Sequence, residues 1–177
     1  MNDRRPSSEL GHLFSKLRTS SAAGAAADCI EVMAGETEQV EGLRSESKFG
    51  NLTLTIDEPV SFGGTGTAPN PAEAMLAALG ASIEVTIRCY AEFMGIQVTS
   101  IGVDLSAELN NQGFFGVNDA VRSGFPAISA KVKIASIEKP DVIAELIGVA
   151  GRCCPVLDNV RHPTDVKLSY EHTTPTA

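Results

Sequence analysis

Two adjacent cysteines near the C-terminus carry the clearest chemistry in this sequence. Cys154 is followed at once by Pro155, and proline is favoured at the first position of a helix. This order predicts that Cys154 is the N-cap of a short helix, where free amides and the positive end of the helix dipole favour a thiolate. Arg152, two residues away, would add to this effect. Such a thiolate could attack a peroxide oxygen or a disulfide, whereas the structural alternative is a small buried side chain.

Two further thiols, Cys153 and Cys89, are candidates to react with an oxidised Cys154. A bond between Cys153 and Cys154 would close a strained ring. Cys89 is seven residues from Ser82, so on one helix the two would share a face and lie about 10 Å apart. Cys89 could equally be a core residue, and Ser82 a small packing residue, since no Gly-x-Ser-x-Gly turn surrounds it.

A long helix within residues 63–96 must position these groups. Asn70 is a good N-cap, Pro71 suits the first helical position, and Glu73 can bond back to the Asn70 amide. Gly95 is a suitable end. The interior is small-sided and apolar on most sides, which predicts a buried core helix, and its central glycine suggests close packing against another backbone.

The rest of the chain predicts strands and shorter helices around this core. Apolar residues alternate over 52–56 and suggest further strands at 29–33, 96–109, 127–136 and 166–170. A second amphipathic helix is expected over residues 140–151. Strands separated by single helices favour an α+β fold on a mixed or antiparallel sheet. We expect this domain over residues 29–172, an accessory helix and linker over 1–28, and a frayed tail over 173–177.

Composition excludes several classes of protein. The net charge of −8 argues against nucleic acid as a partner. No run of about 18 apolar residues is present, so no membrane span is expected. The adjacent cysteines make a poor disulfide framework, and with no apolar leader a reducing cytoplasmic setting is the default. The glycine run at Gly63 lacks a Walker or Rossmann pattern, and the four-residue spacing of Cys154, Asp158 and His162 lacks a second ligand pair, so neither cofactor nor metal is expected.

The blocks DEPVSFGGTGTAPNPAEAMLAALGAS and GRCCPVLDNV, followed by a final strand, resemble the OsmC/Ohr family of osmotically induced and organic hydroperoxide resistance proteins. The resemblance implies an intertwined homodimer with long core helices of both chains at its centre. It also implies a peroxiredoxin-like thiol peroxidase of the oxidative stress response that reduces organic hydroperoxides. In this family a cysteine on the core helix attacks the peroxide, a second cysteine resolves it as a disulfide, and a thiol or lipoylated partner reduces that disulfide.

The resemblance places Ser82 at the nucleophile position, thirteenth counting from Asn70, and Cys154 at the resolving position. In the best-known members the glutamate lies two residues after the asparagine, and this position is Ala72 here. Glu73, one residue later, matches the glutamate of a broader OsmC-like branch. Arg44 matches the family arginine. A hydroxyl cannot form a sulfenic acid, so activity is expected to be altered or lost.

Two hypotheses follow. One is an enzyme that relies on Cys154, with Cys153 or Cys89 resolving it. The other is a non-catalytic protein that binds a small hydrophobic ligand in the family pocket.

Overall fold

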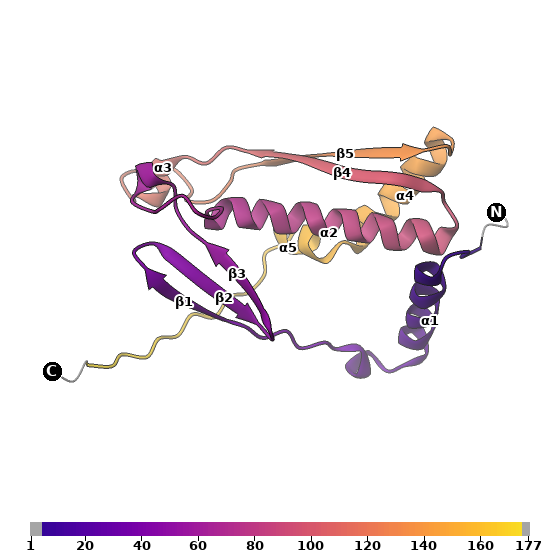
Figure 1. The fold of residues 1–177 in the computed structure, drawn as a ribbon, viewed down its shortest axis with the longest axis horizontal. Helices are drawn as coiled ribbons and strands as arrows, with labels where there is room; N and C mark the ends of the chain where they lie inside the picture. The colour runs from indigo at the N-terminus through magenta and orange to yellow at the C-terminus, as the bar shows by residue number, and fades with distance from the viewer. Residues whose placement is uncertain (1–4, 175–177) are drawn as a thin grey trace.

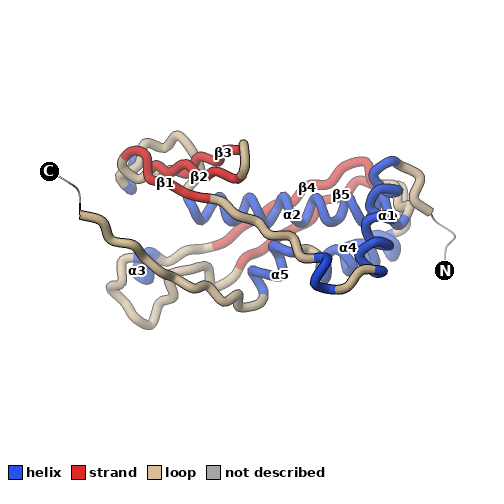
Figure 2. The backbone as a smooth tube through the Cα atoms, turned by 90° about the horizontal axis from the view of Figure 1, so that it is seen from below, coloured by secondary structure: helices blue, strands red, loops and turns tan. Residues whose placement is uncertain are grey.

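A long central helix, α2 (Pro71–Met94), organises the structure. The structure is a computed structural model that describes residues 5–174. An antiparallel hairpin of β4 (Val98–Ala107) and β5 (Ile128–Ser136) covers one side of α2, while α4 (Pro140–Cys153) and α5 (Pro155–Arg161) pack on another (Figures 1 and 2). The fold is therefore α+β with antiparallel sheets, as expected.

The start and end of α2 follow the local rules of its sequence. The amide of Glu73 donates to Asn70 Oδ1 at 2.8 Å, and the Asn70 amide donates to Glu73 Oε2 at 2.9 Å, which completes a capping box. Gly95 ends the helix with a φ of 64°, a conformation that favours glycine. Both predicted ends of the core helix are confirmed.

Only one side of α2 is buried within the chain. Six of its residues are buried: Leu79, Gly80, Ile83, Thr86, Ile87 and Ala91. Val85, on another side, is 62% exposed, so the expectation of burial on most sides is wrong for this chain. Gly80 does mark a close approach, since a Cβ there would lie 2.8 Å from Leu105. Its neighbour is a side chain of β4 and not a second backbone.

The buried core lies between α2, β4 and α4. Its members are Leu79, Ile83, Ile87, Ala91, Ile96, Val98, Leu146, Ala150 and Cys154. By length and composition α2 could cross a membrane, contrary to the expectation of no such span, but core helices of soluble proteins pass the same test. Here its buried side packs on the hairpin and on α4.

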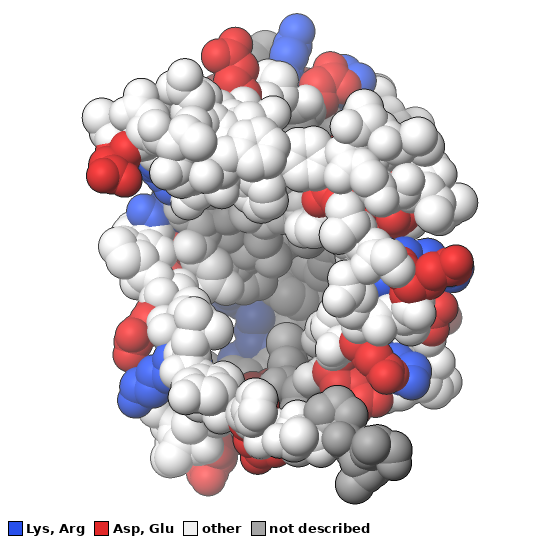
Figure 3. Space-filling view, turned by 90° about the vertical axis from the view of Figure 1, so that its left-hand side faces the viewer, with Lys and Arg blue, Asp and Glu red and all other residues white. Residues whose placement is uncertain are grey.

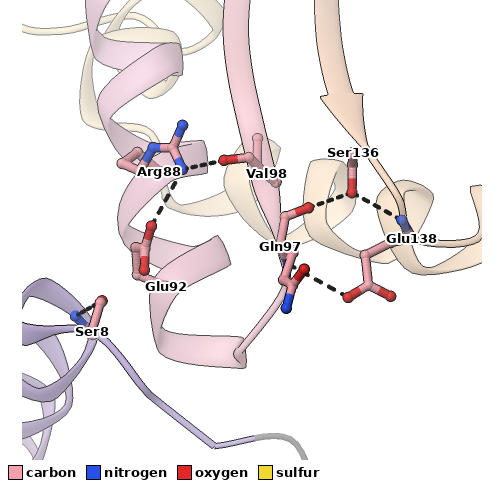
Figure 4. A network of polar contacts seen from close by, with 8 residues as sticks. Ser8, Arg88, Glu92, Gln97, Val98, Ser136 and Glu138 are labelled. Carbon is pink, nitrogen blue, oxygen red and sulfur yellow. Dashed lines mark hydrogen bonds and ion pairs between the residues drawn. The ribbon is translucent and has the colours of Figure 1, made fainter.

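Polar contacts fix the C-terminal end of α2 to the hairpin (Figure 4). Arg88 donates to the Val98 carbonyl at 2.7 Å and to Glu92 at 3.2 Å. The Ser136 hydroxyl donates to the Gln97 carbonyl, and it accepts from the Glu138 amide at 3.1 Å. Helix α2 and both strands therefore meet in one rigid corner.

The N-terminal helix, α1 (Glu9–Ala23), covers the same end of α2. Phe14 packs edge-on against Tyr90 with ring centroids 5.2 Å apart. The guanidinium of Arg18 lies 4.7 Å from the Phe93 ring centroid, within the range of a cation–π contact. The accessory helix is thus an arm that packs on the domain. Residues 1–4 and 175–177 of the expected arm and tail lie outside the described residues.

A second sheet precedes α2. It consists of β1 (Glu36–Glu41), β2 (Arg44–Phe49) and β3 (Leu52–Ile56), antiparallel and in that order. Turns at Gly42 and Gly50, with φ of 53° and 61°, join the strands. The sheet lies apart from α2 in both ribbon views and joins it through residues 57–70, which include a short 3₁₀ helix, Val60–Phe62.

Two expected strands are absent within residues 5–174. Cys29 is the last residue of a 3₁₀ helix, Ala26–Cys29, and residues 30–33 have no regular structure. Segment 166–170 has none either. Both predictions are wrong for the single chain. The physical reason is that a strand needs a neighbour for its backbone hydrogen bonds, and neither segment has one in this chain. Their apolar side chains are exposed, with Leu168 at 94% and Val32 at 85%.

Candidate functional site

Ser82 on α2 meets Cys154, which is a member of the buried core. The Ser82 Oγ and the Cys154 Sγ are 3.2 Å apart, although the residues are 72 positions apart in sequence. Cys154 is only 2% exposed, while Ser82 is half-buried. A buried thiol therefore faces a hydroxyl at hydrogen-bond distance, and either atom can be the donor.

The backbone at Cys154 joins two helices. Its amide donates to the Ala150 carbonyl at 2.9 Å, which ends α4, and its carbonyl accepts from the Asp158 amide at 3.0 Å, which begins α5. The predicted N-cap position of Cys154 is confirmed. Its sulfur makes no capping hydrogen bond and faces Ser82 instead.

The position of Ser82 follows from the packing of α2. Leu79, one turn earlier, and Thr86, one turn later, are buried on the same side of the helix. The Thr86 hydroxyl donates to the Ser82 carbonyl at 2.7 Å. Because α4 packs on this side, the end of α4 brings Cys154 onto Ser82.

The other candidate thiols lie elsewhere. Cys153, the last residue of α4, is exposed, and Cys89 is half-buried on α2. All four cysteines are free. The Cys153 thiol beside Tyr90 raises the pKa of that phenol, and burial raises the pKa of the Cys89 thiol.

Arg44 and Glu73 have partners away from the pair of Ser82 and Cys154. Arg44 lies on β2, where its Nη2 is 3.4 Å from Glu46, and its buried Nε has no hydrogen-bond partner in the described part of the chain. Glu73 serves the capping box of α2, nine residues before Ser82, which is about 13 Å along the helix axis. The single chain does not bring these residues together at one site.

Sequence reasoning missed Asp57, which is the only fully buried carboxylate within residues 5–174. It accepts hydrogen bonds from the backbone amides of Glu58, Thr65 and Thr67 and from both threonine hydroxyls. The Thr65 hydroxyl bond, first among these causes, holds the pKa of the Asp57 carboxyl well below its usual range. The signal in the sequence was an aspartate before a glycine-rich stretch with two threonines, a pattern typical of side-chain-stabilised turns.

This carboxylate shapes the loop that leads into α2. The loop passes so close to the Glu58 carbonyl that a Cβ on Gly64 would overlap it at 1.9 Å. Glycine is therefore required at this position for steric reasons, and the glycine run serves as a turn into the helix.

Two cavities flank the N-terminal half of α2. One of about 960 Å³ includes Leu79 and Leu157 in its wall, each three residues from a member of the Ser82–Cys154 pair. The other, of about 640 Å³, contains Phe62, Phe114 and Phe125. Phe62, Phe114 and Phe115 pack together with centroids 5.3 to 5.7 Å apart. Among residues 5–174 no three His, Cys, Asp or Glu side chains are grouped to hold a metal ion.

Solved structures share this fold. An OsmC-like protein from Mycoplasma pneumoniae has a TM-score of 0.66 and 16% identity, over 75% of this chain and 89% of that one. An organic hydroperoxide resistance protein OsmC from Legionella pneumophila has a TM-score of 0.57 and 22% identity, over 78% and 96%. One from Elizabethkingia anophelis has a TM-score of 0.57 and 16% identity, over 76% and 91%.

Because the identities to these solved structures are low, they show the fold alone. The family is assigned from the sequence. A comparison with curated proteins finds no match. The model of the family described as OsmC-like protein matches residues 64–169, more than half of the chain, and this stretch contains both Ser82 and Cys154. The chain therefore belongs to the OsmC-like protein family, as its two sequence blocks suggested.

Proposed function

We propose that this protein is a thiol redox protein that reduces organic hydroperoxides through Cys154. The observation that carries the proposal is the 3.2 Å contact between Cys154 Sγ and Ser82 Oγ in a buried site. Membership of the OsmC-like family suggests a redox or hydroperoxide-resistance role, and two relatives by fold are named organic hydroperoxide resistance proteins. Of the pair, only Cys154 carries a sulfur that can take this role.

In the proposed reaction the Cys154 thiolate attacks one peroxide oxygen of the substrate. The O–O bond breaks, an S–O bond forms, and the alkoxide leaves as an alcohol after taking a proton. The sulfur is oxidised to a sulfenic acid and the hydroperoxide is reduced. The Ser82 hydroxyl can donate a hydrogen bond to the sulfur before the reaction and to the sulfenic oxygen afterwards.

A thiol must then reduce the sulfenic acid. Attack by one thiol forms a mixed disulfide and releases water, and a second thiol, or the other thiol of a lipoyl group, releases Cys154. Ser82 cannot be the resolving group, because a hydroxyl does not form a disulfide. Cys153 and Cys89 remain the internal candidates, and a small thiol or lipoylated partner in a reducing cytoplasm is the external one.

A direct test uses cumene hydroperoxide with the wild type and with Cys154→Ser. We expect the wild type to gain one oxygen, or one disulfide, per chain by mass spectrometry, and to consume peroxide when dithiothreitol is supplied. Cys154→Ser should lose both signals, while Cys29→Ser, which removes an exposed thiol in the N-terminal segment, should retain them. An unoxidised Cys154 in peroxide-treated wild type would contradict the proposal.

Ser82→Cys provides the complementary test. With two sulfurs in place of sulfur and oxygen, a disulfide can form after a small shift from 3.2 Å to the S–S length of about 2.05 Å. We expect peroxide turnover to rise by roughly 100-fold, because a nearby thiol resolves the sulfenic acid as an intramolecular step. An unchanged rate with no disulfide would show that the site cannot support this chemistry.

We also propose that the protein is a homodimer. Apolar residues exposed on β3, α2 and the C-terminal segment support this, as do the two segments that lack strand neighbours. Figure 3 shows a deep hollow at one end of the molecule that is bordered mostly by uncharged side chains, with Lys or Arg atoms at its floor. Sedimentation equilibrium should give twice the 18.6 kDa chain mass, and a monomer at all concentrations would contradict this assignment.

A second candidate function is binding without catalysis. It is favoured by the hydroxyl at position 82 and by the apolar part of the cavity of about 960 Å³ beside it. Native mass spectrometry of the protein as isolated should then show a bound small hydrophobic molecule, and Cys154→Ser should retain it. A protein that is isolated without ligand but consumes peroxide would favour the enzyme.

A further inference from the structure

A third cavity lies between α2, β5 and the ends of α4 and α5. Its volume is about 390 Å³, within the range of small-molecule sites. Neither Ser82 nor Cys154 is part of its wall, although it shares Ala130, Leu157 and Arg161 with the cavity of about 960 Å³ beside the thiol pair. Its lining residues are Ile83, Ile87, Ala130, Val132, Ile147, Gly148, Ala150, Gly151, Arg152, Leu157 and Arg161.

The wall of this cavity is apolar except for two arginines. Ile83, Ile87 and Ala150 are buried core residues, and they form part of this wall. None of the lining residues is acidic. Within residues 5–174, neither Arg152 nor Arg161 forms an ion pair. The cavity therefore combines an apolar surface with positive charge that the described part of the chain leaves unneutralised.

Both guanidinium groups lie over the same last turns of α4. Arg161 Nη1 is 3.4 Å from the Gly151 carbonyl oxygen. Arg152 Nη1 is 3.8 Å from the place where a Cβ on Gly148 would lie. The two glycines leave the helix surface open there, since a Cβ on Gly151 would meet no atom within 4 Å. Both arginines therefore belong to the part of the cavity wall that the end of α4 forms.

A lining with two arginines and no acidic residue attracts anions, although the chain as a whole has a net charge of −8. Guanidinium groups recognise carboxylates through paired hydrogen bonds, and apolar walls favour an alkyl chain by removing it from water. We propose that this cavity binds an anionic amphiphile, with its carboxylate at Arg152 and Arg161 and its alkyl chain against the isoleucines of α2.

The test measures binding of dodecanoate by isothermal titration calorimetry, below the concentration at which it forms micelles. We expect saturable binding with one site per chain. Dodecanol and dodecyltrimethylammonium, which have the same chain with a neutral or positive head, should bind at least about tenfold more weakly, in line with the usual strength of a charge-assisted hydrogen bond. Equal affinity for all three probes, or no saturable dodecanoate binding, would overturn the proposal.

Variants localise the site. The double variant R152Q/R161Q should weaken dodecanoate binding by about tenfold or more, while Arg122→Gln, on the larger neighbouring cavity alone, should leave it unchanged. Gly151→Leu adds a side chain where space is open and should block binding while the fold remains intact by circular dichroism. Loss of binding in Arg122→Gln but not in the double variant, or full binding in Gly151→Leu, would refute this location.

This site does not depend on the proposed thiol chemistry. Cys154→Ser should bind dodecanoate as the wild type does, even though it can no longer be oxidised at that position. An inactive thiol with normal dodecanoate binding would therefore refute the proposed function alone. Peroxide reduction without dodecanoate binding would refute this inference alone.

Discussion

The middle of the chain and its two flanks differ in whether their apolar side chains are buried within the single chain. Every buried hydrophobic residue of the core lies between Leu79 and Cys154. The flanks, residues 30–56 and 164–170, carry apolar side chains that stay largely in water, such as Met33 at 82%, Leu52 at 69% and Tyr170 at 91% exposure. The part that brings Ser82 to Cys154 therefore has its own core, whereas the flanks contain a three-stranded sheet with exposed apolar side chains and two segments that pair with no strand within residues 5–174. The contact between Ser82 and Cys154 thus forms within one chain, and the proposed homodimer would account for the exposed apolar flanks.

The largest effect should come from removing a core side chain in the middle region. Leu146 on α4 is fully buried, so Leu146→Ala should lower the free energy of unfolding by about 2–5 kcal/mol. Ile137→Ala, at a residue 84% exposed beside β5, is the control and should change it by less than about 0.5 kcal/mol. Urea unfolding measures both free energies. An equal loss of free energy of unfolding in the two variants would contradict a self-contained core in the middle region.

A smaller effect is expected at Asp57, where the first sheet joins α2. Its lowered pKa means that the carboxylate stabilises the folded state fully above the ordinary value of 3.8, and that this contribution is lost as the pH falls below it. Asp57→Asn keeps the shape but loses an acceptor oxygen for the threonine hydroxyls and amides.

We therefore expect a lower Tm at neutral pH for Asp57→Asn, and a smaller gap from wild type as the pH falls from 5 towards 2. Thermal unfolding at several pH values measures this gap. A constant gap across the series would show that the charge of Asp57 contributes nothing.

Dimerisation through the flanks should depend on the charge of their side chains and on the protein concentration. If residues 164–170 form a strand against a second copy, Leu168→Asp places a carboxylate in that interface and should raise the dimer dissociation constant by about tenfold or more. Its far-ultraviolet circular dichroism should match wild type, because the side chain contacts little within its own chain. Unchanged sedimentation would place the interface elsewhere.

The smallest effect concerns the start of α2. Asn70→Ala removes the side-chain acceptor of the capping box and should cost about 1 kcal/mol. Because the cap lies three turns from Ser82, the contact with Cys154 should survive, and peroxide oxidation of Cys154 should proceed at the wild-type rate. A large change in that rate would show that the helix end and the thiol site are coupled.

Helix starts and ends were predicted correctly from the sequence, because local rules determine them. The cap at Asn70, the stop at Gly95, the helix start at Pro140 and the N-cap at Cys154 all depend on residues within a few positions of one another. The pairing of Val103 with Val132 and its neighbours on β4 and β5 also follows the predicted alternation.

Other features depend on groups that lie far apart. Asp57 gains its partners eight and ten residues later, and only when the loop closes. The contact between Ser82 and Cys154 spans 72 residues and was suggested by family resemblance, not by spacing. The apolar patterns at 29–33 and 166–170 suggested strands, but a sequence pattern cannot supply the neighbouring strand that the single chain lacks within residues 5–174.

The two backbone hydrogen bonds at Cys154 have a consequence for the timing of its chemistry. They hold its Cα at the junction of α4 and α5, which leaves the sulfur a single torsion, χ1, with three staggered settings. In one setting the sulfur meets Ser82, and to reach a thiol anywhere else it must rotate away or the seven-residue α5 must unwind. The rate at which an oxidised Cys154 reacts with a second thiol would thus be set by one of two motions. These are rotamer exchange of a packed side chain and local unwinding of a short helix.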